Sequence, residues 1–402
     1  MVQELAALVA GRCLRALGPC LSWRLTTGAM VVALAALAIR PQLLFDGPPV
    51  GVGWGLHQSL LTLALMVNAW QHGVRRSVNW PVLALAAVFA SNLLFSDLEP
   101  KVGLGLMVEG FAVLALPWTF TQVVLAPGSR RTLALVIASL PLLSVALGAL
   151  LQAAGMRAFY TLRLEGATGN AAVFAMLAFT GFAVAMHEST RPSQRGMGLL
   201  AAVNLALVVL SGTRMAILAS GLCLVIYVAM ANSLRAQWRQ RRAELLLGGA
   251  VVVAALAYYW PTLSWRIYSA KQGSLRLSSR NEIWSFYYDQ FLQSPFSGRG
   301  LGAGFVAATD RLDVMLPTPH NEYLHLLVVG GVVGFVVCMV AIALWFRQLF
   351  KIVAGNDRQF LIALLPALAV YAVTDNILIY PTALALFAYL GVLLTPSAPR
   401  PA

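Results

Sequence analysis

Apolar runs of roughly membrane-spanning length alternate with short polar segments along most of this chain. They occupy residues 27–45, 52–70, 78–96, 103–126, 132–154, 171–187, 197–211, 215–232, 245–260, 323–346, 359–377 and 381–396. A helix needs about 20 predominantly apolar residues to cross a bilayer, so we expect about twelve transmembrane helices. The pattern therefore predicts an all-α integral membrane protein.

One polar segment, residues 261–322, is much longer than the others, and loops of such length in compact proteins are usually functional. Within it, Ser279–Glu282 has a capping-box pattern and precedes aromatic residues at helical spacing. We expect an amphipathic helix here that ends before Pro295. The chain then divides into residues 1–260 with nine spans, the loop 261–322, and residues 323–402 with three spans and a cytoplasmic tail.

Composition and charge support a membrane location. Hydrophobic residues make up 59% of the chain and charged residues only 11%, and the net charge is +13. The basic residues are scattered in pairs between the apolar runs, which fits the positive-inside rule better than a nucleic-acid surface. With both termini in the cytoplasm, the basic clusters fall on one side and the long loop faces outward. The four cysteines have neither metal-ligand nor redox spacing.

The stretch that follows this loop carries the first candidate for chemistry. Thr318 is suited to cap a helix and Pro319 to occupy its first position, which places His320 in the first turn. The positive end of the helix dipole favours a neutral imidazole, which is able to accept a proton. Gly330 and Gly334 have GxxxG spacing, which predicts the close approach of a neighbouring helix.

The remaining histidines are weaker candidates. His325 lies on a different helical face from His320, and we expect it to make a structural hydrogen bond inside the bundle. His57, His72 and His187 show no partner at useful spacing, so we interpret them as incidental.

Several charged residues are expected on the outer side. Arg214 lies in a very short turn between two apolar runs, where it either snorkels or binds a ligand. Arg276 and Arg280 are four residues apart, and their mutual repulsion would be relieved by a shared anion such as phosphate. Asp375 is the only acid in its predicted span, and it needs a partner such as an arginine or a histidine. Its role is either structural pairing or catalysis.

At these residues the sequence resembles the O-antigen ligase family. The family pattern of histidine and asparagine, nine residues, and then Gly-x-x-Gly is matched by His320-Asn321 and Gly331-Val332-Val333-Gly334. The segment Ser211–Arg214 resembles the family's Ser-x-x-Arg. Arg280 with Trp284, followed by the glycine-rich stretch 298–304, resembles its Arg-x-x-x-Trp segment. Asp375 is similar to a late acid of the family by its spacing. The similarity covers about residues 170–380.

The resemblance implies a GT-C-like fold and glycosyl transfer on the periplasmic side of a Gram-negative inner membrane. The donor would be an O-antigen polysaccharide on undecaprenyl pyrophosphate, and the acceptor a sugar hydroxyl of lipid A–core. The implied catalytic residues are His320 as base, Arg214 and Arg280, and the implied substrate-binding residues are Arg276, Asn321, Trp284 and Asp375. The residues suggest inverting, metal-independent transfer without a cofactor, and the partners would include membrane lipids but no nucleic acid.

Other functions stay open at this point. An O-antigen polymerase or a protein O-oligosaccharyltransferase would use the same type of donor with a different acceptor. A transporter of lipid-linked sugars is less favoured, because it would need charges deep within the spans and an internal repeat. Neither feature is found in the sequence.

Overall fold

A computed structural model gives the structure of this chain. It describes residues 129–155, 163–191, 194, 196–230, 242–271, 280–300, 319–375, 377 and 382–394, together with single residues between 28 and 38. All the regular elements in the described residues are helices. The predicted all-α class is confirmed for this part of the chain. The predicted spans 52–70, 78–96 and 103–126 lie outside the described residues.

Each predicted apolar run from residue 132 onward corresponds to a helix. These helices are α5 (Ser129–Ala153), α6 (Ala171–Ser189), α7 (Met197–Leu210), α8 (Arg214–Met230), α10 (Arg242–Lys271), α13 (Glu322–Ile352), α14 (Gly355–Ala372) and α15 (Ala383–Leu394). Within the described residues, α5, α6 and α13 are long and apolar enough to cross a membrane, while α7, α8 and the middle of α10 are shorter apolar helices. This supports a helical membrane protein, and the number of twelve spans stays a prediction.

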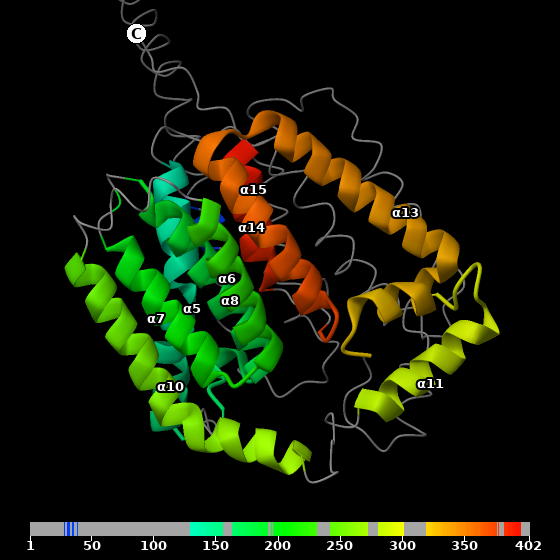
Figure 1. The fold of residues 1–402 in the computed structure, drawn as a ribbon, viewed down its shortest axis with the longest axis horizontal. Helices are drawn as coiled ribbons and strands as arrows, with labels where there is room; N and C mark the ends of the chain where they lie inside the picture. Colours follow the sequence, from blue (N-terminus) through cyan, green and yellow to red (C-terminus); the bar gives the residue numbers. More distant parts are fainter. Residues whose placement is uncertain are drawn as a thin grey trace, which may run out of the picture.

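Helix α6 lies at the centre of the bundle. Nearly all of its side chains are buried, which fits its lack of a polar face. Helices α5, α7, α8, α14 and α15 pack around it, and α10 covers α7 at one edge (Figure 1). The amphipathic helix predicted in the long loop is α11 (Arg280–Gln293), which packs against α13.

Two helix boundaries differ from the sequence prediction. Helix α10 continues through Pro261 as far as Lys271, so the first part of the predicted loop is helical. Helix α13 begins at Glu322 rather than at Pro319. Its N-cap is Asn321, whose side-chain oxygen accepts a hydrogen bond from the Leu324 amide at 3.0 Å. Asparagine is among the strongest N-cap residues, and here it takes the place predicted for Thr318, which lies outside the described residues.

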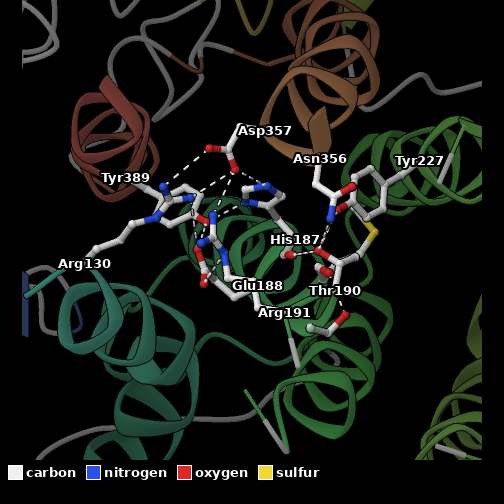
Figure 2. Close-up of polar contacts among 11 residues, drawn as sticks. Arg130, His187, Glu188, Thr190, Arg191, Tyr227, Asn356, Asp357 and Tyr389 are labelled. Atoms are coloured by element: carbon white, nitrogen blue, oxygen red, sulfur yellow. Dashed lines mark hydrogen bonds and ion pairs between the residues drawn. The ribbon is translucent and has the colours of Figure 1, made fainter. Parts of the chain in front are cut away.

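A polar cluster joins the helices at one end of the bundle (Figure 2). We define it as Arg130, His187, Glu188, Arg191, Asp357 and Tyr389. Asp357 at the start of α14 accepts hydrogen bonds from Arg130 of α5 at 3.1 Å and from Arg191, just after α6, at 3.0 Å. Glu188 contacts the same two arginines. The cluster therefore ties together elements that are far apart in the chain.

His187 lies inside this cluster, so the prediction that it is incidental is wrong. Its ring is fully buried, with Nδ1 2.6 Å from the Tyr389 hydroxyl and Nε2 3.0 Å from Asp357. It also stacks on Phe360. Burial alone would raise the pKa of Asp357, which lies ahead of the apolar part of α14. The hydrogen bond from His187 and the charge of Arg130 outweigh that effect and hold this pKa well below its ordinary value.

Candidate functional site

Helix α13 is broken into two arms, and the break determines where the predicted histidine lies. Gly331 has φ 61° and ψ −169°, which is not helical, so a short arm of residues 322–330 turns away from the long arm. The short arm turns back toward the end of α14 (Figure 1). The hydroxyl of Tyr323 on this arm donates a hydrogen bond to the Ala369 carbonyl of α14 at 3.0 Å. The start of α13 is therefore docked on the end of α14.

His320 precedes the short arm rather than lying in its first turn. Its φ is 47°, and it is the one non-glycine residue with a positive φ in the described part of the chain. A left-handed backbone at a residue other than glycine is uncommon, although histidine is among the residues that tolerate it. The prediction that the helix dipole acts on a first-turn His320 is corrected accordingly. The side chain is half-buried, with 17% of its surface exposed.

Asp375 is the partner of His320. Its carboxylate, at 2% exposure, lies just beyond the end of α14, and Oδ1 is 3.5 Å from the Nδ1 atom of His320. The expectation that this acid pairs with a histidine or an arginine is thus met. A carboxylate beside one ring nitrogen fixes the tautomer and the orientation of an imidazole, as in a catalytic triad. The Nε2 atom is then the ring nitrogen able to accept a proton.

The segment before His320 is held by α11. The indole N–H of Trp284 donates a hydrogen bond to the carbonyl of Pro319 at 2.7 Å. Beside it, Ile283, Phe286 and Tyr287 pack against Val328 of the short arm. Trp284 therefore fixes the residue next to His320, and substrate binding by Trp284 and Asn321 stays a prediction.

Arg214 is exposed at the first position of α8. The turn before it is held by Arg163, which sequence reasoning missed. Arg163 donates from Nε to the Ser211 carbonyl at 2.8 Å and from Nη2 to the Thr213 hydroxyl at 2.7 Å. No motif marks Arg163, because its partners lie more than forty residues away in the chain.

Arg214 and Asp375 lie at the same end of the bundle. At the opposite end, Tyr227 near the end of α8 contacts Phe360 near the start of α14, so these neighbouring helices run antiparallel. Arg163 and Asp375 also both act electrostatically on the buried Tyr371. The start of α8, the start of α13 and the end of α14 therefore share one end, which we call the His320 end.

The structure describes some of the other predicted residues and not others. Arg280 is the half-buried first residue of α11, as predicted, and Arg276 lies outside the described residues. His325 lies 3.2 Å from the buried Glu322, in agreement with a structural role. Among the residues that the structure describes, no group of three or more His, Cys, Asp or Glu side chains could hold a metal ion.

This arrangement provides an oriented histidine at the same end of the bundle as the exposed Arg214, which suits proton transfer to or from an anionic ligand. Residues 199–339 match the model of the family described as O-antigen ligase. No curated protein and no solved structure matches the chain significantly. The matched segment includes Arg214, Arg280 and His320, whereas Arg163 and Asp375 lie outside it. Residues 199–339 are thus similar to the O-antigen ligase family, as the resemblance in the sequence indicated.

Proposed function

We propose that this protein is a glycosyltransferase that moves a polysaccharide from undecaprenyl pyrophosphate to a sugar hydroxyl of lipid A–core. The reaction would take place at the periplasmic face of a Gram-negative inner membrane. The observation that carries the proposal is the His320–Asp375 pair at the same end of the bundle as Arg214. The match of residues 199–339 to the O-antigen ligase family supports the donor class.

His320 acts as the general base in this proposal. A sugar hydroxyl is a weak nucleophile, and it attacks more readily when a positioned group accepts its proton. The hydroxyl oxygen bonds to the anomeric carbon of the donor, its proton passes to Nε2 of His320, and the bond from that carbon to the pyrophosphate oxygen breaks. Direct attack from the face opposite the leaving group inverts the anomeric configuration.

Asp375 keeps the His320 ring in the productive tautomer and stabilises the imidazolium that forms. The 3.5 Å separation is long for a hydrogen bond. Catalytic contacts of this kind often shorten only when substrate is bound. Because Asp375 is buried, its negative charge is little screened by water and acts strongly on the ring.

The arginines stabilise the leaving group. Negative charge grows on the pyrophosphate as the bond breaks, and guanidinium groups bind phosphate oxygens in a bidentate manner. Arg214 and Arg280 fill this role in the proposal, with Arg276 as an additional donor contact. Because these cations balance the charge of the leaving group, transfer is expected to proceed in the presence of a chelator.

The test is a transfer assay with purified protein, a lipid-linked glycan donor and lipid A–core, in the presence of EDTA. We expect His320→Gln to lower kcat by about 10²–10⁴-fold, the usual contribution of a general base. The matched control is His325→Gln, which changes a nearby histidine on the short arm that faces Glu322 instead of Asp375.

Three results would contradict the proposal. Normal transfer by His320→Gln would show that His320 is not the general base. Loss of transfer with EDTA would show that the reaction needs a metal ion. Product formed from the lipid-linked donor alone, without lipid A–core, would identify a polymerase instead.

A further inference from the structure

The break in α13 is closed by another part of the chain, the segment 295–300 that follows α11. In an unbroken helix the carbonyls of Val328 and Val329 would accept hydrogen bonds from the amides four residues later. Here the Val328 carbonyl accepts from the Arg299 amide at 2.8 Å, and the Val329 carbonyl accepts from the Gly300 amide at 3.0 Å.

The two amides released by the break are also satisfied by this segment. The amide of Val332 donates to the Pro295 carbonyl at 2.8 Å, and the amide of Val333 donates to the Phe296 carbonyl at 3.2 Å. The two carbonyls and two amides that would pair with each other in an unbroken helix therefore all have partners in 295–300. Unpaired buried backbone groups are costly, so this replacement is what allows the helix to break here.

Two glycines make the contact sterically possible. Gly298 has φ 72° and Gly331 has φ 61°, a conformation that glycine adopts without penalty. A Cβ atom on Gly298 would collide with the Val329 carbonyl oxygen, and one on Gly331 would collide with the Phe296 carbonyl oxygen. A loop therefore approaches Gly331 closely, and the close approach of a helix to Gly330 and Gly334 stays a prediction.

We infer that Gly298 and Gly331 are positioning residues that set the short arm of α13, and with it His320, over Asp375. The paired backbone segments, which we call the glycine junction, fix the angle between the two arms. The short arm carries Tyr323, which docks on α14, and its N-cap follows His320 directly. A shift of the junction would therefore move the imidazole relative to Asp375. The kinetic part of this inference rests on the proposed function.

The test compares Gly298→Ala, Gly331→Ala and the double variant with the wild type. We expect each single variant to lower kcat by about 100-fold, because a misplacement of about 1 Å has that effect in an active site. The donor KM should change less than kcat does, since Arg214 lies on α8 and is not held by the junction, although Arg280 lies on α11, which precedes it. The double variant should lose little more than either single variant, because both changes open the same junction.

Hydrogen exchange provides a readout that does not depend on activity. In the wild type, the amides of Arg299, Gly300, Val332 and Val333 should be protected, and in the variants this protection should be lost while that of α6 remains. The control is Gly221→Ala, in α8, where an added Cβ meets no atom within 4 Å. This variant should keep wild-type exchange and transfer.

Unprotected wild-type amides at these four residues would overturn the inference, even if no alanine variant could be purified folded. Folded Gly331→Ala with kcat within threefold of wild type would also overturn it. A wild type that transfers no glycan but shows the protected junction would refute the proposed function and leave the glycine junction standing.

Discussion

His320 combines an unusual backbone with a set of contacts that hold it. A left-handed residue other than glycine costs about 1–3 kcal/mol and persists only where its surroundings fix it. Here Trp284 holds the carbonyl before it, and the Asn321 cap fixes the chain after it. Asp375 adds a third contact, to the ring itself. Such strain is common at functional sites, which agrees with the role proposed for this histidine.

The contacts of Arg163 predict an effect of this single residue on donor binding. Its guanidinium binds the turn before Arg214 with two different nitrogens, a geometry that lysine cannot reproduce. We expect both Arg163→Gln and Arg163→Lys to raise the donor KM by about tenfold, the value of about one hydrogen bond to a charged group. The acceptor KM should remain unchanged. Steady-state kinetics with each substrate varied in turn would measure both values.

The exposed Arg131 provides the control for Arg163, because Arg131→Gln removes an arginine at the opposite end of the bundle. If the donor KM of Arg163→Gln stayed within twofold of wild type, the turn would be held by other contacts.

At the scale of whole elements, the polar cluster is a charged contact that joins several helices of the described part of the chain. Asp357 joins α14 to Arg130 of α5, to His187 of α6 and to Arg191 just after it. The net gain from such a pair is small, because desolvation offsets the attraction. Removing one member destabilises the protein more strongly, since the remaining charges then lose their counterion. The cluster therefore favours one arrangement of these helices over others.

Asp357→Asn should consequently lower thermal stability. Loss of one partner from a buried ion pair costs about 3–5 kcal/mol, and we expect about 2 kcal/mol here, because a fifth of the Asp357 side chain is exposed. Heating the purified variant and following the monodisperse fraction would measure the loss. The matched control is Asp289→Asn, at an exposed position of α11, which should melt like the wild type.

The pH dependence of the cluster has a definite sign. The pKa of Asp357 is lowered in the folded protein, so its stabilising effect is complete above its ordinary pKa of 3.8 and is lost only as the pH falls through the lowered pKa. The difference in melting temperature between wild type and Asp357→Asn should therefore be the same at pH 5 and pH 7. A difference that shrank by half at pH 5 would contradict this assignment.

At the scale of the whole molecule, the two ends of the bundle differ in their chemistry. The polar cluster lies at one end of the bundle and is next to Arg131. Other basic residues follow it closely in the sequence. The His320 end carries the histidine, Asp375, and the start of α8. The positive-inside rule predicts that the first end is cytoplasmic, and the proposed active site would then face the periplasm.

Cysteine labelling tests this orientation in a cysteine-free background. Val373, at the His320 end, and Tyr288, on α11, are both exposed, as is Arg131 at the cluster end. In cells with a permeable outer membrane but an intact inner membrane, an impermeant maleimide should label Val373→Cys and Tyr288→Cys. Arg131→Cys should react only after the inner membrane is permeabilised. Labelling of positions 288 and 373 from opposite sides would rule out a shared site.

Local chemistry explains which elements were predictable. Helix α11 lies where the capping-box pattern and the aromatic spacing placed it, since those signals act within a few residues. Helix α10 exceeds the predicted apolar run 245–260, since the polar residues that follow Pro261 continue the helix. The predicted start of α13 is too early, because Thr318-Pro319 is also a good helix start. The helix is instead capped by Asn321, which is the stronger N-cap residue.

The sequence by itself determined the apolar helices and the amphipathic α11, and it marked His320, Arg214 and Asp375 as candidate site residues, because hydropathy and motif spacing are local properties. Only the tertiary structure decided that His320 faces Asp375, that Arg163 holds the Arg214 turn and that His187 lies in a charged cluster. It also decided that α13 breaks at Gly331. Each of these depends on residues distant in the chain, whose partners are selected when buried polar groups must find hydrogen bonds in a packed bundle.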